Sequence, residues 1–521
     1  MIVSLLAFAS LAIISVDAIP AGIDTDYYTK VPDTGVTREY WLELVNTTAS
    51  PDGYERIVLT VNGTVPGPTL YADWGDTVKV HLSNSLENNG TSLHFHGIRQ
   101  NYTNPEDGVA SITQCPTAPG DSITYEWRAT QYGTTWYHSH FSLQAWDGVF
   151  GGIIINGPAS SNYDEDAGML FLNDWSHNTA DYLYHSAQVD GPSNLHNGLI
   201  NDTNTYEDDD GNETGSRFTM AVTSGKSYRM RLVNGAIDTH FKFMIDNHTL
   251  TVMSTDLVPI EPYNTTVLSI GIGQRYDVVV TADQDDVATD FWMRAIPQEA
   301  CSDDDSVDNI KGIFHYGTST DDAETPSTSA YSFTDTCLDE SVDDLVPVVS
   351  YDASTSTYSD SEDAAVAYNS DNLFRWYLSD TTFEVEWENP TLLQIYDGAT
   401  SWSNASHVVE VDGTDNWVTV VIETSTAVPH PIHLHGHDFL ILAQGTGTYS
   451  DNVTLSEDNP PRRDIAMLPS SGYLVFALQF IERYSEISSM IDYDTMNATC
   501  TNWDTYATEY DVVVDDDESG I

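Results

Sequence analysis

The chain has 521 residues and a formal net charge of −62, from 80 acidic and 18 basic side chains. Its length exceeds what one hydrophobic core supports and predicts several domains, which its 40% hydrophobic content can fill. So acidic a surface repels phosphate groups, which excludes nucleic acids and anionic membranes as partners.

The N-terminus predicts a secreted protein. Residues 1–18 form an apolar run that ends in Val16-Asp17-Ala18, typical of a signal peptide with a small-residue cleavage site. The run is short for a membrane span and has no basic flanks, so we expect an extracellular protein without a membrane anchor. Eleven Asn-x-Ser/Thr sequons agree with the secretory pathway and predict a glycoprotein.

The rest of the chain divides into three predicted domains. In residues 19–158, short runs of alternating apolar and polar residues are separated by Gly, Pro and Asn turns, a pattern typical of β-sandwich strands. The pattern ends at a Gly-Pro pair, where we place the first boundary. Residues 159–340 repeat it without a His-x-His pair, which predicts a connecting domain with no metal ligands of its own. Residues 341–521 are predicted to form the third domain.

Histidine pairs at three separated places indicate a metal site. The histidines are His94 and His96, His138 and His140, and His430, His433, His435 and His437 in the stretch HPIHLHGHDF. Sixteen histidines in 521 residues would produce about half of one His-x-His pair by chance. Alternate side chains on a strand leave the same face, so each pair can direct two imidazoles at one metal. Ordinary half-buried histidines would explain any single pair, but three separated pairs predict a shared metal centre.

The four cysteines are Cys115, Cys301, Cys337 and Cys500. An oxidising compartment pairs an even number of cysteines, and the sequence permits three pairings. Cys301 with Cys337 would close a local loop, whereas Cys115 with Cys500 would tie the first domain to the last.

Motifs over essentially the whole chain after the leader point to one family: HFHGIRQ, GTTWYHSHFS, IGQRYDVVV, HPIHLHGHDF and NPPRRDIAMLP. In these motifs the sequence resembles the multicopper oxidases, and within them the ascomycete laccases. The resemblance implies an all-β fold of three cupredoxin-like β-sandwich domains with Greek-key topology, and the disulfides Cys115–Cys500 and Cys301–Cys337. It also implies copper as cofactor, phenolic or aromatic substrates, dioxygen as electron acceptor and a role in lignin degradation. We expect a monomer.

The resemblance implies a role for each histidine of the three pairs. His94 and His433 match type 2 copper ligands, and His430 matches one of the two type 1 histidines. The positions that match type 3 copper ligands are His96, His138, His140 and His435. Imidazole suits copper because it is a neutral ligand of intermediate softness. His437 matches no ligand position and is expected either to support a ligand from behind or to pack in the core.

The chain departs from the family after the strand SGYLVFA. The family carries a His-Cys-His-Ile-x-Trp-His element there, whereas here Ala477 and Leu478 lead directly into Gln479 and residues that resemble the following helix. The missing block contains the type 1 cysteine, the second type 1 histidine and two type 3 histidines. We therefore expect this chain to be impaired or inactive as an oxidase, as after a skipped exon or in a faulty gene model.

A second departure concerns the substrate side. Where ascomycete laccases have an acidic residue that accepts the phenolic proton, this chain has His196. It is interpreted either as a substrate base or as an exposed residue without a role.

Three hypotheses remain open. The first is a secreted laccase-type oxidase by descent, impaired in this chain, and the second is a non-catalytic copper-binding secreted protein. The third is an acidic, glycosylated protein with a structural or cation-binding surface. Copper stoichiometry separates the first two from the third, and a blue absorption band separates a complete oxidase from the rest.

Overall fold

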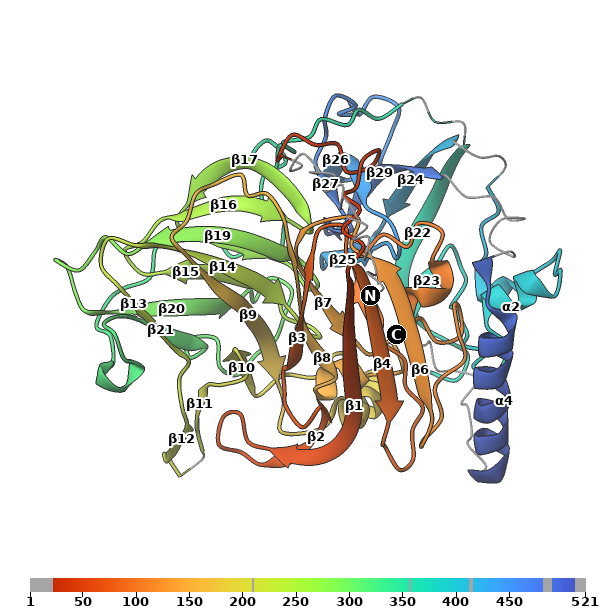
Figure 1. Cartoon of the computed structure of the whole chain (residues 1–521), viewed down its shortest axis with the longest axis horizontal. Helices are drawn as coiled ribbons and strands as arrows, with labels where there is room; N and C mark the ends of the chain where they lie inside the picture. The colour runs from red at the N-terminus through yellow and green to blue at the C-terminus, as the bar shows by residue number, and fades with distance from the viewer. Residues whose placement is uncertain are drawn as a thin grey trace, which may run out of the picture.

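The structure is a computed structural model that describes residues 22–510 apart from 209, 355, 357, 412–415 and 481–489. The predicted signal peptide, residues 1–18, and the acidic C-terminal end lie outside the described residues. Strands dominate and form three β-sandwiches (Figure 1), which confirms the predicted all-β fold. In the described part, no helix is both long and apolar enough to cross a membrane.

The first sandwich packs a sheet in the order β2-β1-β4-β6 against one in the order β3-β8-β7-β5. Alternation drives this packing: Val78, Val80 and Leu82 of β4 point into the core while their neighbours face outward. The elements are β1 (Thr37–Ala49), β2 (Arg56–Val61), β3 (Gly67–Asp73), β4 (Thr77–Asn84), β5 (His94–His96), η1 (Asn104–Asp107), β6 (Ser122–Arg128), β7 (Gly133–His138), η2 (Gln144–Asp147) and β8 (Phe150–Asn156).

The second sandwich has the sheets β10-β9-β14-β19-β16-β17 and β13-β21-β20-β15-β18 around the largest apolar core. Central strands such as β19 are buried along almost their whole length. The elements are β9 (Glu165–Trp175), α1 (Ala180–Asp190), β10 (Asn197–Ile200), β11 (Thr205–Glu207), β12 (Glu213–Gly215), β13 (Thr219–Val222), β14 (Ser227–Asn234), β15 (Phe241–Ile245), β16 (Leu250–Thr255), β17 (Val258–Thr265), β18 (Leu268–Ile270), β19 (Arg275–Thr281), β20 (Asp290–Pro297), β21 (Lys311–Tyr316) and η3 (Thr320–Asp322).

The third sandwich is unequal. One sheet has the order β23-β22-β24-β29-β26-β27, but its partner consists, among the described residues, of β25 and β28 alone. The elements are β22 (Tyr358–Tyr368), β23 (Phe374–Leu378), α2 (Thr391–Tyr396), η4 (Asn404–Ser406), β24 (Asn416–Glu423), β25 (His430–His433), β26 (Phe439–Thr446), β27 (Arg462–Arg463), β28 (Ile465–Leu468), β29 (Gly472–Phe480) and α4 (Tyr493–Tyr510).

The residues at the missing block do not follow the expected pattern. The sequence predicts a helix from Gln479 onward, but β29 continues through Phe480 and pairs with β24, with Trp417 opposite Gln479. Strand pairing with β24 outweighs the local helical resemblance at these two positions. Residues 481–489, which contain the rest of the predicted helix, lie outside the described residues.

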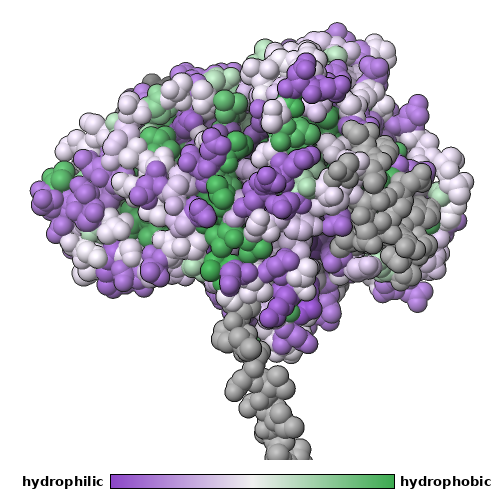
Figure 2. All heavy atoms as spheres, turned by 90° about the horizontal axis from the view of Figure 1, so that it is seen from above, coloured by the Kyte–Doolittle hydropathy of each residue, from purple (hydrophilic) through white to green (hydrophobic). Residues whose placement is uncertain are grey.

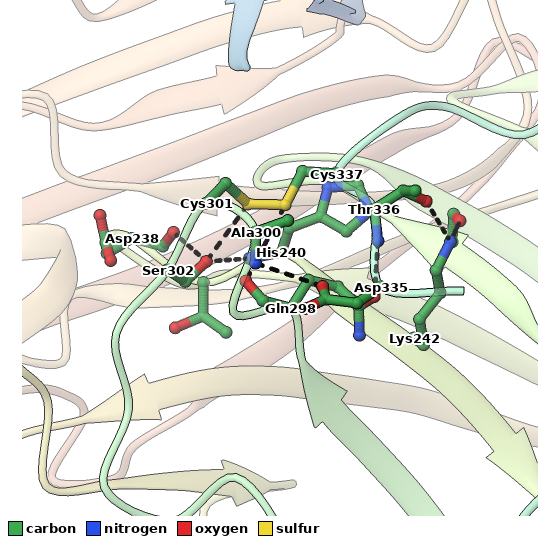
Figure 3. Close-up of a disulfide and its surroundings, with 12 residues drawn as sticks. Asp238, His240, Lys242, Gln298, Ala300, Cys301, Ser302, Asp335, Thr336 and Cys337 are labelled. Atoms are coloured by element: carbon green, nitrogen blue, oxygen red, sulfur yellow. Dashed lines mark hydrogen bonds between the residues drawn. A yellow bond between two sulfur atoms is a disulfide. The ribbon is translucent and has the colours of Figure 1, made fainter. Parts of the chain in front are cut away.

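Two disulfides join distant parts of the chain, with the pairing that the resemblance implied. Cys115–Cys500 connects the first domain to α4, and Cys301–Cys337 links two segments of the middle region. Figure 3 shows the second disulfide with His240, Gln298 and Ser302 around it. No cysteine is left as a free thiol.

The acidic surface should make stability depend on salt. Hydrophilic side chains are spread over the face in Figure 2 and are not gathered at one place. Repulsion among exposed carboxylates is screened as the Debye length falls from ~10 Å at 0.1 M to ~3 Å at 1 M salt. At pH 7 we expect the melting temperature to rise by a few degrees over this range. Near pH 4 the rise should shrink because many carboxylates are protonated. A flat response at pH 7 would show that the charges are already compensated locally.

Candidate metal centre

Six histidines from the first and third domains meet at one place. His94 and His96 lie on β5, which pairs with β7 so that His94 stands opposite His138, and His140 follows β7. From the third domain, β25 ends at His433 and His435 follows it. These short strands exist because each runs beside a partner, β5 with β7 and β25 with β28.

The two domains contribute rings that face each other closely. The centroids of His96 and His433 lie 3.9 Å apart in a parallel stack, and those of His94 and His435 are 4.0 Å apart. His140 completes the group, with its ring 4.9 Å from that of His435. Candidate ligand atoms lie within 4.8 Å of one another in two all-histidine groups, His94/His96/His138 and His94/His433/His435.

Hydrogen bonds fix the orientation of several rings. His94 Nδ1 lies 2.8 Å from the carbonyl oxygen of Asp107, His433 Nδ1 lies 2.7 Å from that of Asp464, and His138 Nδ1 lies 2.9 Å from that of Ser139. An imidazole whose Nδ1 donates to a carbonyl presents the lone pair of Nε2 to a metal.

The atoms left over suit a metal. Within the described part, buried His94 Nε2, His96 Nε2, His433 Nε2 and His140 Nδ1 have no hydrogen-bond partner. Buried polar atoms are normally satisfied, so four unsatisfied nitrogens at one place call for a ligand. Several imidazoles in a small space also suit copper in both oxidation states. The residues therefore fit the copper that the sequence predicted.

Electrostatics keep most of these imidazoles neutral. Burial lowers the pKa of His138 to about 3 and holds the pKa values of His96, His140 and His433 well below the usual value. Burial opposes ionisation of Asp107, but the neighbouring His94 and His435 outweigh it, and the pKa of this carboxyl is lowered. Neutral imidazoles can bind a metal without first losing a proton.

Two acidic residues at the site were missed from the sequence. Asp107 contacts His94 through its carbonyl oxygen, and its Oδ2 lies 3.0 Å from His435 Nδ1. The other residue is Asp464, whose Oδ1 lies 3.3 Å from His96 Nε2. A sequence signal existed, because Asp464 stands in the stretch NPPRRD and Asp107 in PEDGV, close after the first histidine pair. Among 80 acidic residues, however, no spacing rule singles these two out.

His430 lies apart from the six-histidine cluster. It begins β25, and its ring packs edge-on against Trp376 at 4.4 Å. Its Nε2 has no hydrogen-bond partner among the described residues, and burial lowers its pKa to about 4. A blue copper site needs a thiolate beside two imidazoles, and all four cysteines of this chain are in disulfides. His437 lies outside the cluster too, with Nδ1 3.2 Å from the carbonyl oxygen of His435.

His196 lies just before β10 and is half-buried. Its Nδ1 accepts a hydrogen bond from the backbone N–H of His177 at 3.4 Å and lies 3.1 Å from Ser176 Oγ. Its ring stacks on that of His177 with centroids 4.8 Å apart. Burial and the neighbouring His177 lower the pKa of His196, which favours the neutral ring.

Three consecutive sandwiches with a histidine cluster between the first and the third define the class of the protein. Three multicopper oxidase family models match residues 43–160, 166–319 and 381–483. The chain belongs to the multicopper oxidase family.

Within this family, the chain is similar to laccases. The chain is 44% identical to Laccase-2 of Botryotinia fuckeliana over 96% of this chain and 91% of that protein, and 42% identical to Laccase-1 of the same organism over 92% and 88%. Its structure is similar to the crystal structure of laccase from Botrytis aclada, with a TM-score of 0.90, 42% identity, and coverage of 96% of this chain and 97% of the other.

Proposed function

We propose that the chain is a secreted, glycosylated laccase-type multicopper oxidase by descent, and that in its present form it binds copper without oxidising phenols. One observation carries the proposal. Six histidines converge from two domains and four of them have an unsatisfied buried nitrogen, while no cysteine is free to complete a type 1 site. Membership of the family and the similarity to laccases support it.

The roles of individual residues follow from this proposal. His94 and His433 would hold the type 2 copper, and His96, His138, His140 and His435 would contribute to the type 3 pair. Copper supplies the one-electron redox chemistry and the reduction of dioxygen when it is bound there. Asp107 keeps a negative charge beside His94 and His435 and orients both rings through hydrogen bonds. His430 alone does not provide an electron-accepting site.

The substrate side rests on His196. With a phenolic or aromatic substrate, its neutral ring would accept the phenolic proton. The hydrogen bond from the His177 N–H to Nδ1 implies that Nε2 carries the ring proton, so the ring would have to change tautomer or give Nδ1 to the substrate. His196 is the candidate substrate base.

Copper content tests the proposal. The purified chain loaded with Cu(II) and dialysed should retain copper, and His94→Ala and His433→Ala should each lose most of it, because each ring belongs to a candidate ligand group. His81→Ala is the matched control, since His81 lies on β4 and bonds to Glu39 and Thr124 outside the cluster. Equal copper in all four proteins would favour a general cation-binding surface instead.

The second candidate is a non-catalytic copper-binding protein. It is favoured by the same observation, that all four cysteines are in disulfides and none can bind a type 1 copper. It predicts the same copper content, but it also predicts no phenol oxidation after the missing block is restored. Restoring the missing block therefore separates the two candidates.

A further inference from the structure

Four buried charges meet where the middle domain touches the third. Asp256 and Arg275 come from the middle domain, and Arg463 and Asp464 from the third. Each is at most 1% exposed. Arg275 grips Asp464 with both ends of its guanidinium group, Nη1 to Oδ1 at 2.7 Å and Nη2 to Oδ2 at 2.5 Å, and Arg463 Nε pairs with Asp256. Two parallel charge-assisted hydrogen bonds give such a fork a fixed geometry.

Asp464 connects this group to the histidine cluster. Its carbonyl oxygen lies 2.7 Å from His433 Nδ1, and its Oδ1 lies 3.3 Å from His96 Nε2. His96, His433 and Asp464 are therefore themselves a group that could hold a metal, with ligand atoms within 4.8 Å of one another. Two imidazoles and one carboxylate form a known type of metal site, but one that differs from an all-imidazole copper centre.

The backbone is shaped for this close approach. Gly97, directly after His96, has φ +74°, and a Cβ there would collide with the carboxylate of Asp464 and the guanidinium of Arg275. Gly273, two residues before Arg275, has φ +77°, and a Cβ there would lie 3.1 Å from His96 Cε1. Residues with a side chain rarely adopt such a positive φ. Glycine at both positions therefore lets the middle domain lie close to the histidine cluster.

The fork occupies both oxygens of Asp464. Without Arg275, the buried carboxylate would lose its strongest partners, and the nearest remaining groups are His96 and His433. A buried anion that loses its countercharge seeks another partner or a proton. The nearby metal would be such a partner.

We propose that Arg275, a middle-domain residue outside the ligand set, positions Asp464 so that its carboxylate stays out of the copper coordination while its carbonyl orients His433. The middle domain thereby determines which side chains can bind copper at a site to which it contributes no ligand. This inference rests on the proposed copper binding by the six histidines. Loss of an outer partner of a metal ligand typically weakens metal binding ~10- to 100-fold.

The test compares variants of the full chain loaded with Cu(II) alone. For Arg275→Gln we expect a ~10- to 100-fold lower copper affinity, measured by competition with a chelator. We also expect a changed Cu(II) electron paramagnetic resonance spectrum. Arg275→Lys keeps the charge but not the fork, so it should fall between wild type and Arg275→Gln. Arg275→Gln combined with Asp464→Asn should recover most of the wild-type spectrum, because no free carboxylate remains while the carbonyl contact to His433 is kept.

Arg294→Gln is the matched control. Arg294 forms a similar two-point pair with Asp246, 2.8 Å at each contact, within the middle domain. It should lower the melting temperature without changing copper affinity or the spectrum. Wild-type affinity and spectrum in folded Arg275→Gln would overturn the inference and leave the proposed function intact. Absence of copper from the wild-type chain would overturn both. If circular dichroism shows that Arg275→Gln does not fold, Arg275→Lys decides by the same two readouts.

Discussion

Insertion of the missing His-Cys-His block between Ala477 and Gln479 is expected to convert a colourless, inactive chain into a blue protein that oxidises phenols. The thiolate makes a type 1 site a fast one-electron acceptor, and His430 cannot hold copper in that geometry alone. The inserted residues would take the place beside β24 that Leu478 and Gln479 now occupy. They would also add to the sheet that now consists of β25 and β28 among the described residues.

The controls for this restoration separate chemistry from folding. The same insertion with serine in place of its cysteine should fold and bind copper but remain colourless and inactive. Circular dichroism and copper content measured on one sample of the unrestored chain show whether its third domain is folded. Blue colour together with turnover of a phenol such as syringaldazine in the unrestored chain would contradict the prediction. It would require a type 1 copper site in a chain whose cysteines are all in disulfides.

Removal of the Cys115–Cys500 disulfide is expected to produce the largest loss of stability from any covalent change. The link joins residues 385 apart in sequence, and both cysteines lie in an apolar cluster with Trp503, Phe141 and Trp387. Cys115→Ser with Cys500→Ser should lower the free energy of unfolding by ~2–5 kcal/mol, because the unfolded chain regains the freedom that the closed loop removed. Thermal unfolding without reductant measures the loss.

The second disulfide provides the matched control. Cys301 and Cys337 are 36 residues apart. Since the loop-closure entropy grows with the logarithm of loop length, removing this link should cost about 2 kcal/mol less than removing Cys115–Cys500. Equal melting temperatures for the two double variants would show that packing around α4 compensates for the long link, and that the chain-entropy argument does not hold here.

The sequence alone determined the features that repeat over short distances. Strands were predictable because side chains alternate with a period of two, as in β4, and the His-x-His pairs fit the same period. The absence of the type 1 cysteine was also readable, because the resemblance places that cysteine just after Ala477 and none of the four cysteines stands there. These properties depend only on neighbouring residues or on comparison with the family's motifs.

Only the tertiary structure decided what meets across the domains. That His96 stacks on His433, that Asp107 orients His435 and that Arg275 grips Asp464 depends on segments up to hundreds of residues apart, for which no local period exists. The strand through Gln479 is another such case, because pairing with Trp417 of β24 overrides the local preference. Sequence patterns therefore identified the histidines. Only the contacts in the folded chain showed that Asp107 and Asp464 lie against these histidines and that Arg275 pairs with Asp464.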